Sequence, residues 1–421
     1  MKLTRRQVGL GLVGVSLTGC GEGAGFGTPR AAAITLASAS GPAASEPAPA
    51  AVPDSGYEAW VRAFKTRAVA KGLSQATLDA AFAAAGYLPE VIEKDQSQFQ
   101  TRRTLEDYIA VAASDARLKA GARKLKAHGR TLARIEARYG VQKEVLVAIW
   151  GMESSFGARR GTTPVISALS TLGYRSRRAA FFETQLVAAL AILQAGDISP
   201  AKMTGSWAGA MGHTQFIPTT YQAHAVDFTG DGRRDIWSDD PTDALASTAN
   251  YLAHSGWQAG RLWGVEAWLP AGRDDLVTRT VADWRARGVT LATGGALPDH
   301  GPATLILPNG AGGPAFLLFG NYHAFRAYND SMKYALAVGH LADRLAGGGP
   351  LKGNFGADAQ GLTLAERKEM QARLTRAGFD TQGTDGVIGD KTTAAIRGYE
   401  RARGLAETGI ASQALLAHLR G

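Results

Sequence analysis

The chain of 421 residues contains a single cysteine, which excludes an intrachain disulfide, a cysteine-based zinc site and an iron–sulfur cluster. No apolar run reaches the ~18 residues that a spanning helix needs, so the chain is not a polytopic membrane protein. Acidic residues are the minority, with 37 Asp+Glu against 46 Lys+Arg and a formal net charge of +9. This balance favours an anionic partner, such as nucleic acid, an acidic membrane face or an anionic cell-wall polymer. The absence of a long Lys/Arg block argues against nucleic acid.

What is present is a globular composition, 45% hydrophobic and 20% charged, with enough length for two or three domains. From about residue 57, apolar residues recur every three or four positions, which predicts helices. The predicted helices cover 57–70, 75–85, 102–112, 116–128, 132–139, 143–154, 177–194, 200–205, 242–255 and 329–345. Between 263 and 319 the spacing of apolar residues changes, and short strands are predicted over 303–307 and 316–319.

The composition also divides the chain into segments. Residues 1–20 have the basic start, the apolar stretch and the small residues of an export signal, which ends at Cys20. Residues 21–54, almost all Gly, Ala, Ser, Pro and Thr, predict a flexible tether. Residues 55–345 are predicted to form the main domain, 346–360 a second linker, and 361–421 a small helical module.

The densest chemical signal is the stretch 145–157, VLVAIWGMESSFG. Glu153 lies one turn after Ile149 and Trp150, near the end of a predicted helix. Apolar neighbours disfavour the anion and raise the pKa of such a carboxyl, which can then donate a proton to a leaving oxygen near neutral pH. The alternative is a surface glutamate at a helix end.

Two later stretches supply groups that suit a sugar-binding groove. SWAGAMGHTQFIPTTY, residues 206–221, combines small residues with the amide of Gln215, and NYHAFRAYNDSMKYALAV, residues 321–338, interleaves aromatic and amide groups. Aromatic faces stack on sugar CH surfaces, and amides bind hydroxyls and acetamides. Each aromatic taken alone also suits a buried core position.

These blocks, together with DFTGDGRRDIW and ALASTANYLAHSGW, resemble in order and spacing the membrane-bound lytic murein transglycosylase B family over residues 57–345. The resemblance implies a mainly α, lysozyme-like catalytic domain with a few short strands. It implies that Glu153 is the single catalytic acid/base and that six residues bind substrate: Ser206, Gln215, Tyr251, Tyr328, Asn329 and Tyr334. Trp207 is a departure, since a tyrosine is common at that position.

The implied reaction cleaves the β-1,4 bond between N-acetylmuramic acid and N-acetylglucosamine and forms a 1,6-anhydro end. Ordinary glycosidases use two carboxylates, whereas this family uses one. The alternatives are a hydrolytic muramidase and a non-catalytic peptidoglycan-binding lipoprotein. The expected partner is the glycan strand, not nucleic acid, and the protein is expected to be a monomer.

The signal resembles that of bacterial lipoproteins, with Leu-Thr-Gly-Cys as its lipobox. This implies cleavage before Cys20, lipidation of its thiol and a periplasmic enzyme anchored to the outer membrane. An ordinary secretory signal is the alternative, and Arg5-Arg6 leaves twin-arginine export open.

Residues 227–238, DFTGDGRRDIWS, have the spacing of a calcium loop, but Ser238 occupies the position of the closing glutamate. Asp239, Asp240 or Asp243 can supply that carboxylate. No cofactor is expected for the chemistry, and calcium is a candidate structural ion. Its candidate ligands are Asp227, Thr229, Asp231, Arg233 and Asp243. The alternative is a turn held by Asp/Arg salt bridges.

The C-terminal stretch 362–419 resembles the small peptidoglycan-binding domain of wall enzymes, which implies a three-helix module. Gly378-Phe379 match its first turn and Asp385-Gly386 its DGxxG loop. Asp385 is expected to cap backbone N–H groups there. Most of these residues are architectural, so no individual ligand contacts are assigned.

Overall fold

The computed structural model describes residues 47–97, 104–270, 277–310 and 312–421. The predicted signal, Cys20 and most of the predicted tether lie outside these residues. The end of that tether belongs to the fold, because Val52 N–H donates to the Tyr87 carbonyl at 2.9 Å and Asp54 caps the first helix. No helix in the described ranges has the length and apolar character that crossing a membrane requires.

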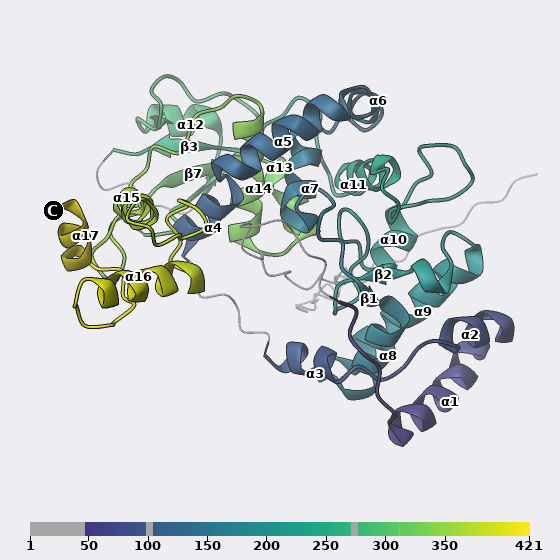
Figure 1. Ribbon diagram of the computed structural model, residues 1–421. Helices are drawn as coiled ribbons and strands as arrows, with labels where there is room; N and C mark the ends of the chain where they lie inside the picture. The colour runs from purple at the N-terminus through teal and green to yellow at the C-terminus, as the bar shows by residue number, and fades with distance from the viewer. Residues whose placement is uncertain (1–46, 98–103, 271–276, 311) are drawn as a thin grey trace, which may run out of the picture.

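The first group of helices is built on the antiparallel pair α8 and α9, against which α1, α2, α3 and α10 pack. Local signals begin them, since Asp54 and Ser74 accept N–H groups of the first turns of α1 and α2 and Pro89 occupies the first turn of α3. This group lies at one end of the molecule (Figure 1). Its helices are α1 (Ser55–Ala70), α2 (Gln75–Phe82), α3 (Pro89–Gln96), α8 (Val165–Arg175), α9 (Ala179–Ala195) and α10 (Pro218–His224).

The second group surrounds α7, which contacts α5, α6, α11 and α14. Every residue of α7 from Val145 to Met152 is buried, so this helix is the centre of the main hydrophobic core. The group consists of α4 (Leu105–Ala112), α5 (Asp115–Ala127), α6 (Gly129–Tyr139), α7 (Lys143–Ser154), α11 (Thr242–His254), α13 (Asn321–Tyr328) and α14 (Met332–Leu345).

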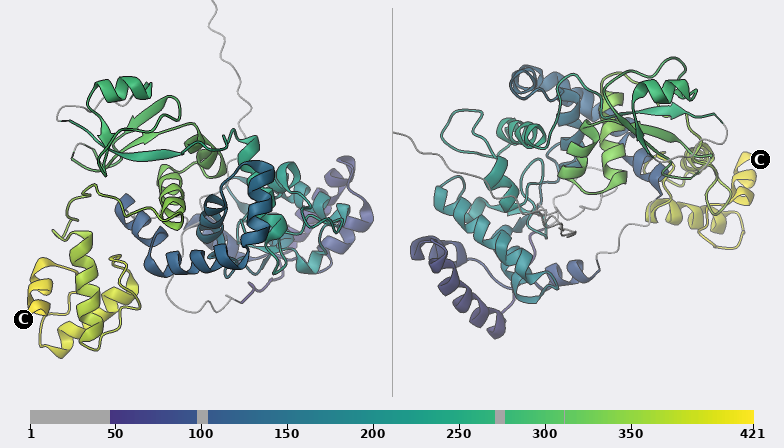
Figure 2. Two further views of the ribbon diagram at one scale, coloured as in Figure 1. Left: turned by 90° about the horizontal axis from the view of Figure 1, so that it is seen from above. Right: turned by 180° about the vertical axis from the view of Figure 1, so that it is seen from behind.

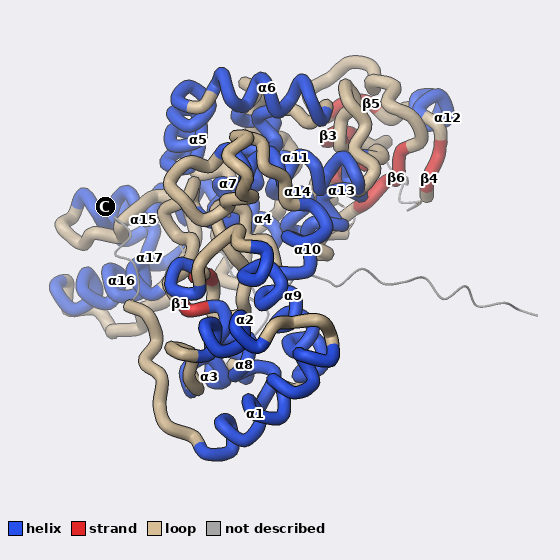
Figure 3. The backbone as a smooth tube through the Cα atoms, turned by 90° about the vertical axis from the view of Figure 1, so that its right-hand side faces the viewer, coloured by secondary structure: helices blue, strands red, loops and turns tan. Residues whose placement is uncertain are grey.

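A five-stranded antiparallel sheet in the order β4-β6-β7-β3-β5 stands beside the helices and has its own small core around Trp284 and Phe319. Most of the strands in the described structure gather there, as the red segments of Figure 3 show. A two-residue pair, β1 with β2, lies apart from it. The elements are β1 (Thr163–Pro164), β2 (Thr204–Gly205), β3 (Gly264–Trp268), β4 (Thr278–Arg279), α12 (Val281–Ala286), β5 (Thr290–Leu291), β6 (Ala303–Ile306) and β7 (Ala315–Leu318).

Several predicted helices differ from the observed structure. The helix predicted over 75–85 ends at Phe82, and the one predicted over 132–139 begins at Gly129. Residues 200–205 form one 3₁₀ turn, η1 (Pro200–Lys202), followed by β2 rather than a helix. The helix predicted over 329–345 begins only at Met332, because Asn329 is extended and the Ser331 side chain accepts the Tyr334 N–H as an N-cap.

The C-terminal module consists of α15 (Leu364–Arg376), α16 (Asp390–Ala402) and α17 (Gln413–Arg420), packed around a core of their own. Thr363 and Glu366 form a capping box at the start of α15. The module lies beside α4, at the opposite end of the molecule from α1 and α2 (Figures 1 and 2). The predicted linker 346–360 has no helix or strand, yet Leu351 and Phe355 pack against the main core.

One buried arginine connects the module to the main domain. Arg367 of α15 is only 3% exposed, and it forms ion pairs with Glu106 and Asp107 of α4 at 2.7 and 3.0 Å and with Asp358 of the linker at 3.0 Å. The linker is also fixed to β3, because Glu266 accepts the N–H groups of Lys352 and Gly353. The module is therefore docked rather than loosely tethered.

Replacing Glu106 and Asp107 together by alanine is expected to undock the module, because Arg367 then keeps only Asp358 as an ionic partner. Breaking a buried ion pair costs about 3–5 kcal/mol. Proteolytic cleavage within residues 346–360 should accelerate by about tenfold or more, the equivalent of ~1.4 kcal/mol. Arg373→Ala, which removes a more exposed ion pair with Glu369 on α15, is the control. Equal cleavage rates in all three proteins would contradict the docking role.

Candidate active site

Helix α7 carries Glu153 in its last turn, directly after the continuously buried segment Val145–Met152. The helix stops abruptly because Ser155, Phe156 and Gly157 all adopt left-handed backbone angles, with φ of 51°, 60° and 87°. Two consecutive non-glycine residues in that region are strained. Packing of Phe156 against Trp150 holds the turn, with ring centroids 6.0 Å apart.

Glu153 is half-buried, and Oε1 accepts a hydrogen bond from Tyr334 Oη at 2.6 Å. Burial raises the pKa of Glu153 from its usual 4.5 to about 7, although the Tyr334 hydrogen bond acts in the opposite direction. No other carboxylate in the described structure contributes to this shift. A large share of the Glu153 side chains is therefore protonated at neutral pH.

Tyr334 belongs to a row of three tyrosines from separate helices, of which Tyr328 and Tyr334 are buried and Tyr251 is partly buried. Its ring is parallel to that of Tyr328 with a centroid distance of 6.5 Å, and Tyr328 is 5.3 Å from Tyr251. Tyr328 Oη donates to the Thr214 carbonyl at 2.6 Å, and Tyr251 Oη donates to the Ala327 carbonyl at 2.7 Å. Burial, followed by the nearby charge of Glu153, raises the pKa of Tyr328 and Tyr334, so both remain neutral hydrogen-bond donors.

The remaining predicted substrate residues lie on loops. Gln215 has a positive φ of 56° and donates through Nε2 to the carbonyls of Gly212 and Arg160, at 2.8 and 3.0 Å. Asn329 is buried at the end of α13. Ser206 Oγ accepts the Ala210 N–H within its own loop. The structure thus joins Glu153 directly to Tyr334 and indirectly to Tyr328 and Tyr251. The Ser206 hydrogen bond stays within its own loop, whereas Gln215 connects its loop to the segment that follows α7 through the Arg160 carbonyl.

His213 is a part of this architecture that sequence reasoning did not single out, although it stands inside the quoted block 206–221. Its Nδ1 accepts the Trp150 indole N–H at 3.1 Å, so Nε2 carries the hydrogen and donates to the Ser238 carbonyl at 2.7 Å. The backbone carbonyl of His213 accepts Ser154 Oγ at 2.5 Å. Burial lowers the pKa of His213 to about 4, so the ring is neutral and fixes the end of α7 in place.

The predicted calcium loop brings three carboxylates together. Oxygens of Asp227, Asp231 and Asp243 lie within 4.8 Å of one another, a donor set that suits Ca²⁺. Asp243, in the first turn of α11, also accepts the N–H groups of Phe228 and Thr229, each at 2.9 Å. Burial raises the pKa of Asp243.

The other predicted closing residues have different partners. Asp239 pairs with Arg160 at 2.8 Å, and Asp240 accepts the Thr242 hydroxyl at 2.6 Å. Arg234 pairs with Asp197, outside the loop. Among the described residues, neither Arg233 nor Arg234 forms an ion pair with the three clustered carboxylates. The alternative of a turn held together by Asp/Arg salt bridges therefore does not describe this cluster.

Glu153→Gln is expected to stabilise the protein at pH 8 and leave its stability nearly unchanged at pH 4. The folded-state pKa lies above the unfolded value, so the group's stabilising contribution is complete below pH 4.5 and is lost as pH rises through 7. A pKa unit corresponds to ~1.4 kcal/mol, and solvent screening at this partly exposed group reduces the effect. The free energy of unfolding at pH 8 should therefore rise by about 2 kcal/mol in the variant. Denaturant unfolding at both pH values measures it, and an equal effect at both would contradict the shifted pKa.

Comparison with known proteins places these features in a family. Residues 56–343 match the family model of the transglycosylase SLT domain, and residues 363–419 match that of a peptidoglycan binding domain. Membrane-bound lytic murein transglycosylase B from Escherichia coli K12 is 36% identical over 213 residues, which are 49% of this chain and 58% of that protein. The match therefore spans less than two thirds of that relative's length.

Solved structures extend the similarity. SltB3 from Pseudomonas aeruginosa, in complex with NAG-NAM-pentapeptide, is 46% identical with a TM-score of 0.70 and covers 87% of this chain and 100% of its own. The Escherichia coli lytic transglycosylase Slt35, in complex with calcium, is 28% identical with a TM-score of 0.59 and covers 71% and 95%. The expected mainly α, lysozyme-like fold with a C-terminal helical module is confirmed. The chain belongs to the transglycosylase SLT domain family and ends in a peptidoglycan binding domain.

Proposed function

We propose that this chain is a lytic murein transglycosylase that cleaves the bond between N-acetylmuramic acid and N-acetylglucosamine and leaves a 1,6-anhydro end. One observation carries the proposal: Glu153 has the pKa of a general acid near neutrality and is held by Tyr334 in the last turn of α7. The family, and relatives named as lytic transglycosylases, support it.

The first step is proton donation. Protonated Glu153 gives its proton to the glycosidic oxygen, the C1–O bond breaks, and the substrate acetamide stabilises the cation that develops at C1. Ser206 and Asn329 orient that acetamide, while Gln215 and the three tyrosines contact the strand. The Tyr334 hydrogen bond stabilises the Glu153 carboxylate left behind, which prepares it for the second step.

In the second step the Glu153 carboxylate removes the proton of the muramic C6 hydroxyl, whose oxygen attacks C1. Glu153 thereby returns to its protonated form, and no water is consumed. The attack is intramolecular, so no further entropy is lost in bringing the reacting groups together. Hydrolysis by the same acid with water as nucleophile is the alternative, and the chemistry of the product ends separates the two.

We infer that Asp227, Thr229, Asp231, Arg233 and Asp243 hold a structural calcium ion, Arg233 through its backbone. The carboxylate cluster and the calcium complex of Slt35 support this. The ion would tie the loop 227–238 to α11 and would take no part in the proton transfers.

We further propose that the protein is exported to the periplasm and anchored to the outer membrane by lipid on Cys20. The resemblance of residues 1–20 to a lipoprotein signal supports this, and so does the name of the membrane-bound relative. The anchor would keep the enzyme beside its polymeric substrate.

Glu153→Gln is expected to lower the rate of murein solubilisation about 10³-fold, within the 10²–10⁴ that general acid–base catalysis contributes. Glu144→Gln, near the start of the same helix, is the matched control and should retain full activity. Mass spectrometry of the wild-type digest should find 1,6-anhydro ends. Reducing ends would assign the hydrolytic reaction instead, and an active Glu153→Gln variant would refute the role of this acid.

Calcium is expected to raise the melting temperature of the full chain relative to the same protein in EDTA. At a concentration 100 times Kd, binding stabilises by about 2.7 kcal/mol, worth several degrees for a chain of this size. Asp231→Asn should abolish most of the shift, whereas Asp239→Asn, whose partner is Arg160, should preserve it. No calcium-dependent shift in the wild type would exclude the ion.

A further inference from the structure

A deeply buried arginine of α5 contacts the helix end that carries Glu153. Arg117 is 4% exposed, and its Nη1 donates to the Gly151 carbonyl at 3.1 Å and to the Met152 sulfur at 3.4 Å. Gly151 and Met152 are the two residues of α7 that directly precede Glu153. The Arg117 guanidinium is therefore bound to the backbone from which the Glu153 side chain projects.

The Gly151 carbonyl belongs to the last turn of α7, where a helix supplies few donors of its own. The Ser154 carbonyl, in the same turn, accepts the Arg159 N–H at 2.8 Å. That donor belongs to the segment that follows the helix, so it moves together with the helix end. Arg117 comes from a different helix, and its hydrogen bond attaches the last turn of α7 to α5.

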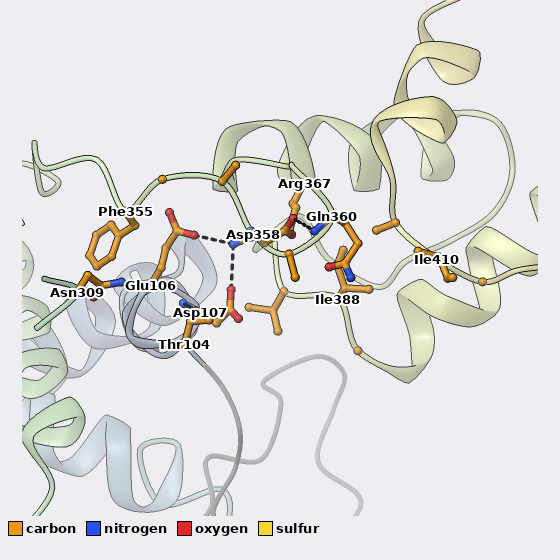
Figure 4. Close-up of a pocket in the computed structure, with 17 residues that line it drawn as sticks. Thr104, Glu106, Asp107, Asn309, Phe355, Asp358, Gln360, Arg367, Ile388 and Ile410 are labelled. Carbon is orange, nitrogen blue, oxygen red and sulfur yellow. Dashed lines mark hydrogen bonds and ion pairs between the residues drawn. The ribbon is translucent and has the colours of Figure 1, made fainter. Parts of the chain in front are cut away.

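Arg117 differs from the other arginine that is buried to this degree in the described structure. Three carboxylates form ion pairs with Arg367, as Figure 4 shows for the surroundings of that side chain, whereas no carboxylate of the described residues forms one with Arg117. Burial lowers the pKa of Arg117 to about 10, and Tyr108 and Arg159 are the titratable groups nearby, so the guanidinium stays charged at neutral pH. Its charge instead faces the carbonyl end of α7, the negative end of the helix dipole.

Close packing holds α5 against this helix end. A Cβ atom at Gly151 would lie 2.7 Å from the Phe156 ring, and one at Gly121, a turn after Arg117 on α5, would lie 2.7 Å from the Leu345 side chain and 3.4 Å from the same ring. The Phe156 ring therefore contacts both α5 and α7, and the two glycines permit that contact. This packing leaves the Arg117 side chain little freedom to turn away from the Gly151 carbonyl.

We propose that Arg117 is a positioning residue for Glu153, whose bond to the Gly151 carbonyl fixes the last turn of α7 and keeps the Glu153 carboxyl against Tyr334. The inference rests on the proposed function, in which Glu153 is the acid. Burial and the Tyr334 hydrogen bond account for the shifted pKa of Glu153, and Arg117 is not among its causes. Arg117 therefore acts on Glu153 through the backbone rather than through its charge. A buried cation without a carboxylate partner lowers the free energy of unfolding, which suits a residue with a positioning role rather than a stabilising one.

The first test is kinetic and uses soluble glycan strands of peptidoglycan with the full chain. Arg117→Met removes the donor and the charge, so it is expected to lower kcat between about tenfold and a hundredfold while KM changes less than about twofold. Arg117→Lys keeps a donor and the charge and should recover most of that loss. Lys119→Met, which removes an exposed cation of the same helix, is the matched control and should retain the wild-type kcat. A wild-type kcat in Arg117→Met, or a loss confined to KM, would overturn the proposal.

The second test needs no catalysis, because it uses the stability gain that Glu153→Gln gives at pH 8. In the Arg117→Met background this gain should shrink by about half or more, since a loosened turn admits water and lowers the pKa of Glu153 towards 4.5. In the Arg117→Lys background the gain should persist. If Arg117 acted through its charge, its removal would raise the pKa of Glu153 and the gain would grow. An unchanged or larger gain in the Arg117→Met background would therefore overturn the proposal. The product ends released by the wild type report on the proposed function separately, and this comparison of stabilities decides the role of Arg117 whatever they are.

Discussion

A carboxyl that is kept partly dry at the end of a buried helix is the constraint on which this structure depends. Glu153 holds its proton near neutral pH because α7 has no solvent-facing side from Val145 to Met152, so water reaches the carboxyl only at the helix end. That arrangement lowers the free energy of unfolding, because burial disfavours the ionised form of Glu153. Ser155 and Phe156 are also held in strained backbone angles. Ser154 and Trp150, both bound to His213, stabilise the turn that presents the acid.

Local sequence signals were sufficient to predict a helix where it has one polar and one apolar face, or where its ends are marked by capping or turn residues. The bounds predicted for α7, 143–154, agree with the structure. Ser331 caps the true start of α14 at Met332, three residues after the start that was predicted. Helix α8 was missed although Val165, Leu169 and Leu172 recur at helical spacing. Its serines and threonine are buried as well, so they do not mark a solvent-facing side. Strands such as β1 and β5 have two residues each, too few for a period to be visible.

Fewer features of the candidate active site than of the helices could be predicted from the sequence alone. Glu153 was selected from its apolar neighbours, but the substrate roles of Tyr251, Tyr328 and Tyr334 came from the family resemblance and stay predictions. No periodicity shows that Tyr334 Oη reaches Glu153 across 181 positions of sequence, since the packing of α14 on α7 creates that contact. His213 was overlooked because a lone histidine among small residues carries no local signal. Asp243 was one of three candidates to close the loop, and the start of α11 selected it.

Because the C-terminal module is docked on the main domain, its position relative to Glu153 is fixed. A flexible tether raises local concentration in proportion to the volume it explores, and it imposes no register between two sites. Arg367 between α15 and α4, with the linker fixed to Glu266, removes that freedom and sets a constant separation between the module and Glu153. Where a ligand is a polymer with a regular repeat, a fixed separation between two binding places restricts which repeat unit reaches the second place once the first is occupied. The buried ion cluster is in this sense a specificity element, since buried charges stabilise weakly but define geometry.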